Sequence, residues 1–155
     1  MGEKRDKPGV RIKFVFNVCN DVAAIREFYV NVLGIEEVHF MDTEEWGWLA
    51  TNSDGFQMMW FRADKPQEVP TEFACQPGWA GGVREVTSWG IEIPESDFAG
   101  VLAKLKAAET PKFKPEPDWR QDSYWGVSVL DPMGVTVEVY TMPAERPEST
   151  EWPGT

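Results

Sequence analysis

The stretch WGVSVLDPMGVTVEVY, residues 125–140, decides the fold, because it is typical of two antiparallel strands joined by a tight turn. The sequence Asp-Pro-Met-Gly at 131–134 supplies the turn, since proline presets one backbone dihedral and glycine tolerates a positive φ. After the turn, valine alternates with Thr136, Glu138 and Tyr140. This period of two predicts a strand with one packed face and one face that lines a cavity.

The hairpin has an earlier counterpart at 46–61, WGWLATNSDGFQMMWF, with the same spacing from Trp-Gly to the turn glycine. The surrounding patterns repeat as well, which is the signature of internal duplication. We expect a strand at 10–18, a helix ending at Gly34, strands at 35–42, 45–51 and 56–62, then a strand at 86–93, a helix to about Ala108, and strands at 112–116, 123–130 and 134–141. The chain is therefore predicted to be an α+β protein of two tandem βαβββ modules.

The same patterns divide the chain into five segments. The connection 63–84 holds three prolines and three glycines without periodicity, so we expect a long loop there. The segment after residue 142 is rich in Pro, Glu, Ser and Thr, which predicts disorder. The expected organisation is a flexible N-terminus at 1–9, a first module at 10–62, the connecting loop at 63–84, a second module at 85–142 and a disordered tail at 143–155.

Composition excludes some partners. The net charge of −11 argues against nucleic acid and against an anionic membrane, because both attract a basic surface. No apolar run approaches the roughly 20 residues of a membrane-spanning helix, and the N-terminus lacks the apolar core of a secretory signal. We therefore expect a cytoplasmic protein. Cys19 and Cys75 have no metal-binding or redox spacing, so structural thiols are expected.

Two motifs carry a family resemblance. Phe28-Tyr29 with Val32-Leu33-Gly34 ends the first helix, and the turn at 131–134 is followed by Glu138. Together they resemble the vicinal oxygen chelate superfamily, which includes glyoxalase I, ring-cleaving dioxygenases and bleomycin-resistance proteins, over roughly residues 10–142. The resemblance implies that the two modules form a curved mixed sheet around a cleft, and that the protein is a homodimer.

Metal-dependent members of that superfamily take four ligands from the first and last strands of the two halves. Carried over to this sequence, the positions are Lys13 or Phe14, Met59, Ser88 and Glu138. Only Glu138 is a suitable donor for a divalent ion, and the single histidine, His39, lies on another strand. The resemblance therefore implies no metal and no cofactor. One hypothesis is that Lys13 pairs with Glu138 in place of the metal; the alternative is that Lys13 extends into solvent.

Strand alternation gives the residues that face the cleft. They mix aromatic and thioether groups with a few hydrogen-bonding groups, as small-molecule pockets do, and the chain's eight tryptophans add flat surfaces. The expected ligand-binding residues are Lys13, Asn17, Gln57, Met59, Phe61, Ser88, Glu92, Tyr124, Ser128, Glu138 and Tyr140.

Three functions remain open from the sequence. The leading one is a metal-free protein similar to the drug-binding, antibiotic-resistance branch of the family, which sequesters an aromatic or flat small molecule. The alternative is an enzyme of the same fold, a lyase, isomerase or dioxygenase, that uses Glu138 as general base or metal ligand. The third is a structural or regulatory protein with a vestigial pocket.

Overall fold

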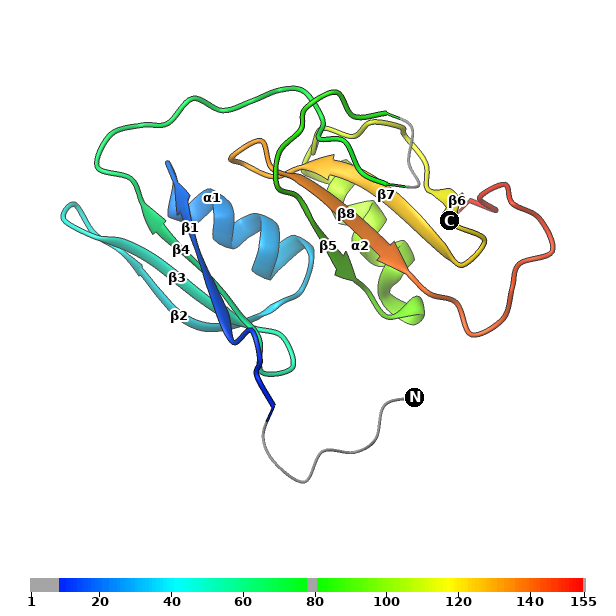
Figure 1. Cartoon of the computed structure of the whole chain (residues 1–155), viewed down its shortest axis with the longest axis horizontal. Helices are drawn as coiled ribbons and strands as arrows, with labels where there is room; N and C mark the ends of the chain where they lie inside the picture. Colours follow the sequence, from blue (N-terminus) through cyan, green and yellow to red (C-terminus); the bar gives the residue numbers. More distant parts are fainter. Residues whose placement is uncertain (1–8, 78–80, 155) are drawn as a thin grey trace.

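The computed structural model describes residues 9–77 and 81–154, so the predicted flexible N-terminus lies almost wholly outside the described residues. The chain forms two four-stranded mixed sheets that lie side by side, each with its own helix (Figure 1). This confirms the predicted pair of modules.

Both modules have the same topology. In the first, the sheet order is β1-β4-β3-β2, and in the second it is β5-β8-β7-β6. The first strand of each module pairs in parallel with the last one, and the remaining pairs are antiparallel. The elements are β1 (Phe14–Cys19), α1 (Val22–Arg26), the π-helix η1 (Glu27–Val32), β2 (Glu36–Asp42), β3 (Gly47–Asn52), β4 (Gln57–Arg62), β5 (Trp89–Glu92), α2 (Glu95–Ala107), β6 (Asp118–Arg120), β7 (Tyr124–Leu130) and β8 (Thr136–Thr141).

A capping side chain and a glycine bound the first helical segment. The Asp21 side chain accepts a hydrogen bond from the backbone N–H of Ala24 at 3.1 Å, which satisfies one free donor of the first turn. The helix then widens into η1, where Leu33 N–H donates to Phe28 C=O, an i→i−5 bond. Gly34 ends it at φ +88°, a conformation that suits glycine.

One hydrophobic core joins the two modules. Trp60 of the first sheet and Val139 of the second are each at most 1% exposed, as are Tyr29 and Phe98 from the two helical segments. A side chain of this size stabilises the fold by roughly 1.5–3 kcal/mol when it is fully buried. The helix-facing sides of both sheets are therefore packed into this core.

The two family motifs meet at the junction between the modules. The Tyr29 hydroxyl donates to Asp131 Oδ2 at 2.6 Å and accepts from Trp89 Nε1 at 3.1 Å. The other carboxylate oxygen of Asp131 accepts the backbone N–H groups of Met133 and Val135. One buried carboxylate thus shapes the second module's turn and ties it to the first module's helix.

The connecting loop runs across this junction (Figure 1). Asn20 and Gln67 exchange two hydrogen bonds, at 2.7 and 2.8 Å. Farther along, Pro70 lies so close to Gly134 that a Cβ there would stand 2.2 Å from the proline carbonyl oxygen. The loop then reaches the second sheet, where Ala74 N–H donates to Thr136 Oγ1 at 2.7 Å.

Three sequence expectations differ from the structure. The first strand begins only at Phe14. The strand expected at 112–116 is replaced by β6 a few residues later. The tail expected to be disordered packs on the second module instead, because the Trp152 ring contacts those of Phe98 and Trp125 at 5.6 and 5.1 Å. Within the described residues, no helix has the length and apolar character needed to cross a membrane.

Candidate functional site

The register of the first sheet decides which side chains share its open face. Phe14, Phe16 and Val18 of β1 pair with Gln57, Met59 and Phe61 of β4, so these six lie on one side. The prediction that Lys13 and Asn17 line this face is therefore wrong. Cys19 is fully buried against the core, which turns Val15 and Asn17 toward the helix. Apolar residues occur on both sides of this strand, so its packed side was misassigned, and a one-residue slip reverses every side chain.

The open face of the first sheet is aromatic. The Phe16 ring lies 5.3 Å from that of Phe14 and 5.9 Å from that of Trp48. Phe14 and Phe16 are 52% and 56% exposed, and Trp48 is the cross-strand neighbour of Phe61. Exposed, contiguous apolar surface of this kind marks an interaction or ligand-binding face.

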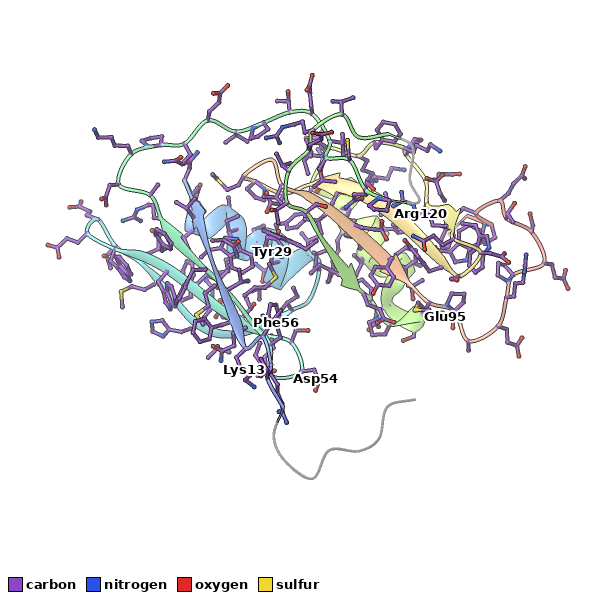
Figure 2. The ribbon with its side chains drawn as sticks, in the orientation of Figure 1. Lys13, Tyr29, Asp54, Phe56, Glu95 and Arg120 are labelled. Carbon is purple, nitrogen blue, oxygen red and sulfur yellow. The ribbon has the colours of Figure 1, made fainter. Side chains whose placement is uncertain are left out.

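The open face of the second sheet is polar and is centred on Glu138. Arg120 Nη1 donates to Glu138 Oε2 and to Ser128 Oγ, each at 3.1 Å, and Arg120 Nη2 lies 3.4 Å from Asp118 Oδ2. The Arg120 side chain is 4% exposed and that of Glu138 is 14% exposed. Figure 2 shows Arg120 in the second module and Lys13 at the far end of the first, beside Asp54. The hypothesis of a Lys13–Glu138 pair is therefore wrong, because Arg120 takes that place.

A glycine makes room for the arginine. Arg120 is opposite Tyr124 in the β6–β7 ladder, and its side chain extends across Gly126. A Cβ at Gly126 would lie 3.1 Å from Arg120 Cδ and 3.3 Å from two of its nitrogens. Any larger residue at 126 would therefore push the guanidinium away from Glu138.

The connecting loop contributes a second unpredicted residue. Gln76 Nε2 donates to Ser88 Oγ at 3.1 Å, and Gln76 Oε1 accepts from Ser128 Oγ at 3.5 Å. The network therefore runs from Ser88 through Gln76 and Ser128 to Arg120 and Glu138. A shallow, open depression of about 870 Å³ adjoins it, and Cys75, Gln76 and Thr87 are among the residues that line it.

Two tyrosines flank the carboxylate. The rings of Tyr124 and Tyr140 are 5.1 Å apart. Burial and a hydrogen bond to Glu138 raise the pKa of Tyr124 to about 12. Burial and the nearby charges of Glu92 and Glu138 also raise the pKa of Tyr140. Both hydroxyls are therefore neutral hydrogen-bonding groups at physiological pH.

The structure brings together most of the predicted site residues, but on two separate sheets. Sequence reasoning missed Arg120 and Gln76, because each lies in a segment assigned to irregular structure. For Arg120, the only signal in the sequence was that residues 118–120 can form a short strand. For Gln76, the sequence held no signal. Gln57, Met59 and Phe61 lie on the first sheet. Glu92, Tyr124, Ser128, Glu138 and Tyr140 lie on the second, and Ser88 directly precedes β5.

The positions that would hold the metal of a vicinal oxygen chelate protein carry the wrong donors. Phe14 and Met59 on the first sheet and Ser88, directly before β5, offer a ring, a thioether and a hydroxyl. None of these is a good ligand for a hard or borderline divalent ion. The remaining carboxylate, Glu138, is held by a guanidinium that opposes cation binding. Among the described residues, no three His, Cys, Asp or Glu side chains are grouped as a metal site requires. The residues present do not fit that metal.

Comparison with known proteins places this geometry in a family. The sequence profile of the Glyoxalase/Bleomycin resistance protein/Dioxygenase superfamily matches residues 11–139. The chain belongs to this superfamily. No curated protein sequence matches it.

Solved structures of the superfamily share the fold at low sequence identity. The fosfomycin resistance protein FosX from Listeria monocytogenes is 14% identical, with a TM-score of 0.59 over 90% of this chain and 98% of FosX. A glyoxalase/dioxygenase from Nostoc punctiforme is 16% identical, with a TM-score of 0.62 over 92% and 99%. Lactoylglutathione lyase from Agrobacterium tumefaciens is 21% identical, with a TM-score of 0.52 over 87% and 96%.

Proposed function

We propose that this superfamily member binds an aromatic or flat small molecule without a metal and releases it unchanged. The observation that carries the proposal is the buried pair of Arg120 and Glu138. In this fold, Glu138 is the residue that would ligate a metal or act as a base. Here a guanidinium neutralises it, so the face offers recognition rather than catalysis.

The aromatic open face supports the choice of ligand. The half-exposed rings of Phe14 and Phe16 and the partly buried ring of Trp48 offer an apolar surface, on which an aromatic ligand gains both buried area and ring contacts. The polar network around Arg120 supplies the few hydrogen-bonding groups that fix orientation in such sites. The similarity to a fosfomycin resistance protein agrees with a role in antibiotic resistance.

The assembly and location are part of the same proposal. The family resemblance predicts a homodimer, and the apolar open face of the first sheet is a surface that a second copy or a ligand would cover. A cytoplasmic location stays a prediction from the sequence.

An enzyme of the same fold is the alternative. The observation that favours it is the hydrogen bond between Tyr124 and Glu138, since a tyrosine next to a carboxylate is a proton-transfer pair once the carboxylate is released from Arg120. Similarity to a lactoylglutathione lyase agrees with this alternative. It requires a substrate that displaces the arginine.

A binding experiment separates the two. The protein is titrated with a panel of flat aromatic antibiotics, with and without EDTA, while tryptophan fluorescence is recorded, and the compounds are then recovered for mass spectrometry. We expect saturable quenching that survives EDTA and compounds of unchanged mass. Phe16→Ser should weaken binding, whereas Val83→Ser, which alters another exposed apolar residue, on the loop, should not. A new product mass, or binding abolished by EDTA, would refute sequestration.

A further inference from the structure

A second pocket lies where the helical side of the first module meets the second module. Its volume is about 490 Å³, within the range of roughly 300–1,000 Å³ that is typical of small-molecule sites. Four segments meet around it: the first helical segment, the connecting loop, the turn between β7 and β8, and the residues that follow α2 (Figure 1). We call it the helix-side pocket. Its lining shares no described residue with the network around Glu138 or with the aromatic face of the first sheet.

The walls of the helix-side pocket are apolar and conformationally restricted. Val32 and Leu130 line it and are each only 5% exposed, so core side chains bound the pocket. Pro70, Pro111 and Pro132 line it as well, and the ring of each fixes the backbone φ. A site built from such residues is largely formed before a ligand arrives, so little ordering of the protein opposes binding.

The charged side chains in the lining are all acidic. Among the described lining residues there are carboxylates at Glu27, Glu109 and Asp131 but no Lys, Arg or His. The Asp131 carboxylate is already occupied by the Tyr29 hydroxyl and two backbone N–H groups. Glu27 and Glu109 are exposed, and within residues 9–77 and 81–154 neither forms an ion pair. Glu27 accepts only from the neutral amide of Asn31, at 2.6 Å, so both negative charges are available to a ligand.

The position relative to α2 has the same sign. Residues 108–110 line the pocket directly after α2 ends, and the C-terminal end of a helix dipole favours a positive charge. Lys104 and Lys106 in the last turn of α2 are not part of the lining. A carboxylate beside apolar surface attracts a cation more strongly than one surrounded by water, because the effective dielectric constant is lower there.

We propose that the helix-side pocket binds a small organic cation with an apolar body, such as an arylalkyl ammonium ion. The apolar body covers the walls formed by Val32, Leu130 and the prolines, and the ammonium group is held by the carboxylates of Glu27 and Glu109. The inference goes beyond the proposed function and does not rest on it, since the ligand of that proposal occupies the open faces of the sheets.

A series of ligands that differ in charge tests the preference. Protein with ¹³C-labelled methyl groups is titrated at neutral pH with benzylamine, a cation under these conditions, and with benzyl alcohol and benzoate, which are neutral and anionic compounds of similar shape. We expect benzylamine to shift the methyl signals of Val32, Val69 and Leu130 saturably, whereas those of Val86, which lies outside the pocket, should stay in place. Benzylamine should bind about fivefold or more tightly than benzyl alcohol, and benzoate should bind most weakly.

Two charge variants test the carboxylates. Glu27→Gln and Glu109→Asn should each weaken benzylamine binding by about two- to fivefold, the effect of one exposed charge pair, and should leave the binding of benzyl alcohol unchanged. Asparagine suits position 109 because Glu109 has a φ of +53°. The matched control is Asp54→Asn, which removes the same charge at a φ of +49° in the turn between β3 and β4 and should have a smaller effect.

A filling variant tests the pocket itself. Ala24 lines the pocket, whereas its neighbour Ala23 is exposed and does not. Ala24→Leu should therefore abolish the binding of benzylamine and of benzyl alcohol, while Ala23→Leu, the same change one residue earlier in α1, should leave both unchanged. Circular dichroism checks that each variant is folded, and the two charge variants decide the matter if Ala24→Leu is not.

The outcomes separate this inference from the proposed function. Equal affinity for benzylamine and benzyl alcohol, or equal weakening by Asp54→Asn, would overturn the choice of a cation. Shifts that are absent, or that survive Ala24→Leu, would overturn the pocket. The shifts should persist in Phe16→Ser, the variant that alters the open face; their loss there would place benzylamine on that face and would also overturn the inference.

Discussion

Replacing Arg120 by methionine should destabilise the protein strongly. The substitution keeps most of the side-chain volume but leaves the Glu138 carboxylate, 14% exposed, without its guanidinium. Removing one partner of a buried ion pair costs about 3–5 kcal/mol. Because Tyr124 still donates a hydrogen bond to Glu138, we expect the lower end, about 3 kcal/mol. That is a large part of the roughly 5–15 kcal/mol by which domains are stable.

The effect is measurable in two ways. Urea unfolding followed by tryptophan fluorescence gives the free energy of unfolding, and a thermal scan should show the melting temperature lowered by about 6–12 °C. The double variant R120M/E138M removes both charges, so it should recover to within about 1 kcal/mol of the wild type. Lys114→Met, which removes a 53% exposed partner of Asp118, is the control and should cost less than about 0.5 kcal/mol.

Two results would refute this reasoning. The first is an R120M variant within about 1 kcal/mol of the wild type, below the range for an unpaired buried charge. The second is an R120M/E138M variant no more stable than R120M alone. In either case the Glu138 carboxylate would be free of Arg120 in solution, and the enzymatic alternative would gain support.

Four further predictions concern the scaffold. Tyr29→Phe removes the donor to Asp131 and should lower the free energy of unfolding by about 1–3 kcal/mol in urea titrations. Burial raises the pKa of Asp131 above 3.8, so its ionisation opposes folding and stability should fall as pH rises from near that value through the folded pKa; Asp131→Asn should remove this component of the pH dependence. Gly134→Ala places a Cβ 2.2 Å from the Pro70 carbonyl oxygen at φ +72°, and should lower the melting temperature, whereas Gly100→Ala, on open helix surface, should not. Trp152→Ala should expose the rings of Phe98 and Trp125 and increase proteolysis of the tail, whereas unaltered cleavage would mean that the tail does not pack in solution.

The sequence by itself determined the modules, because their signals are local. The Asp-Pro-Met-Gly turn and the alternation after it define β7 and β8 within sixteen residues. The glycine at 34 marks the end of the first helix in the same way. Repetition of these signals predicted two βαβββ units, and the motif pair predicted the family, both of which are confirmed. The sequence also indicated that most positions corresponding to the family's metal ligands carry unsuitable donors, because that depends only on the residue type at each motif position.

Only the tertiary structure decided what surrounds Glu138. Its partner Arg120 lies 18 residues away and Gln76 is 52 residues from Ser128, while Tyr29 and Asp131 are separated by 102 residues. The side of β1 that faces the core was equally hidden, because that strand is apolar on both sides. Turn and strand patterns record the preferences of neighbouring residues, whereas these contacts arise from the packing of two modules and the path of the loop between them.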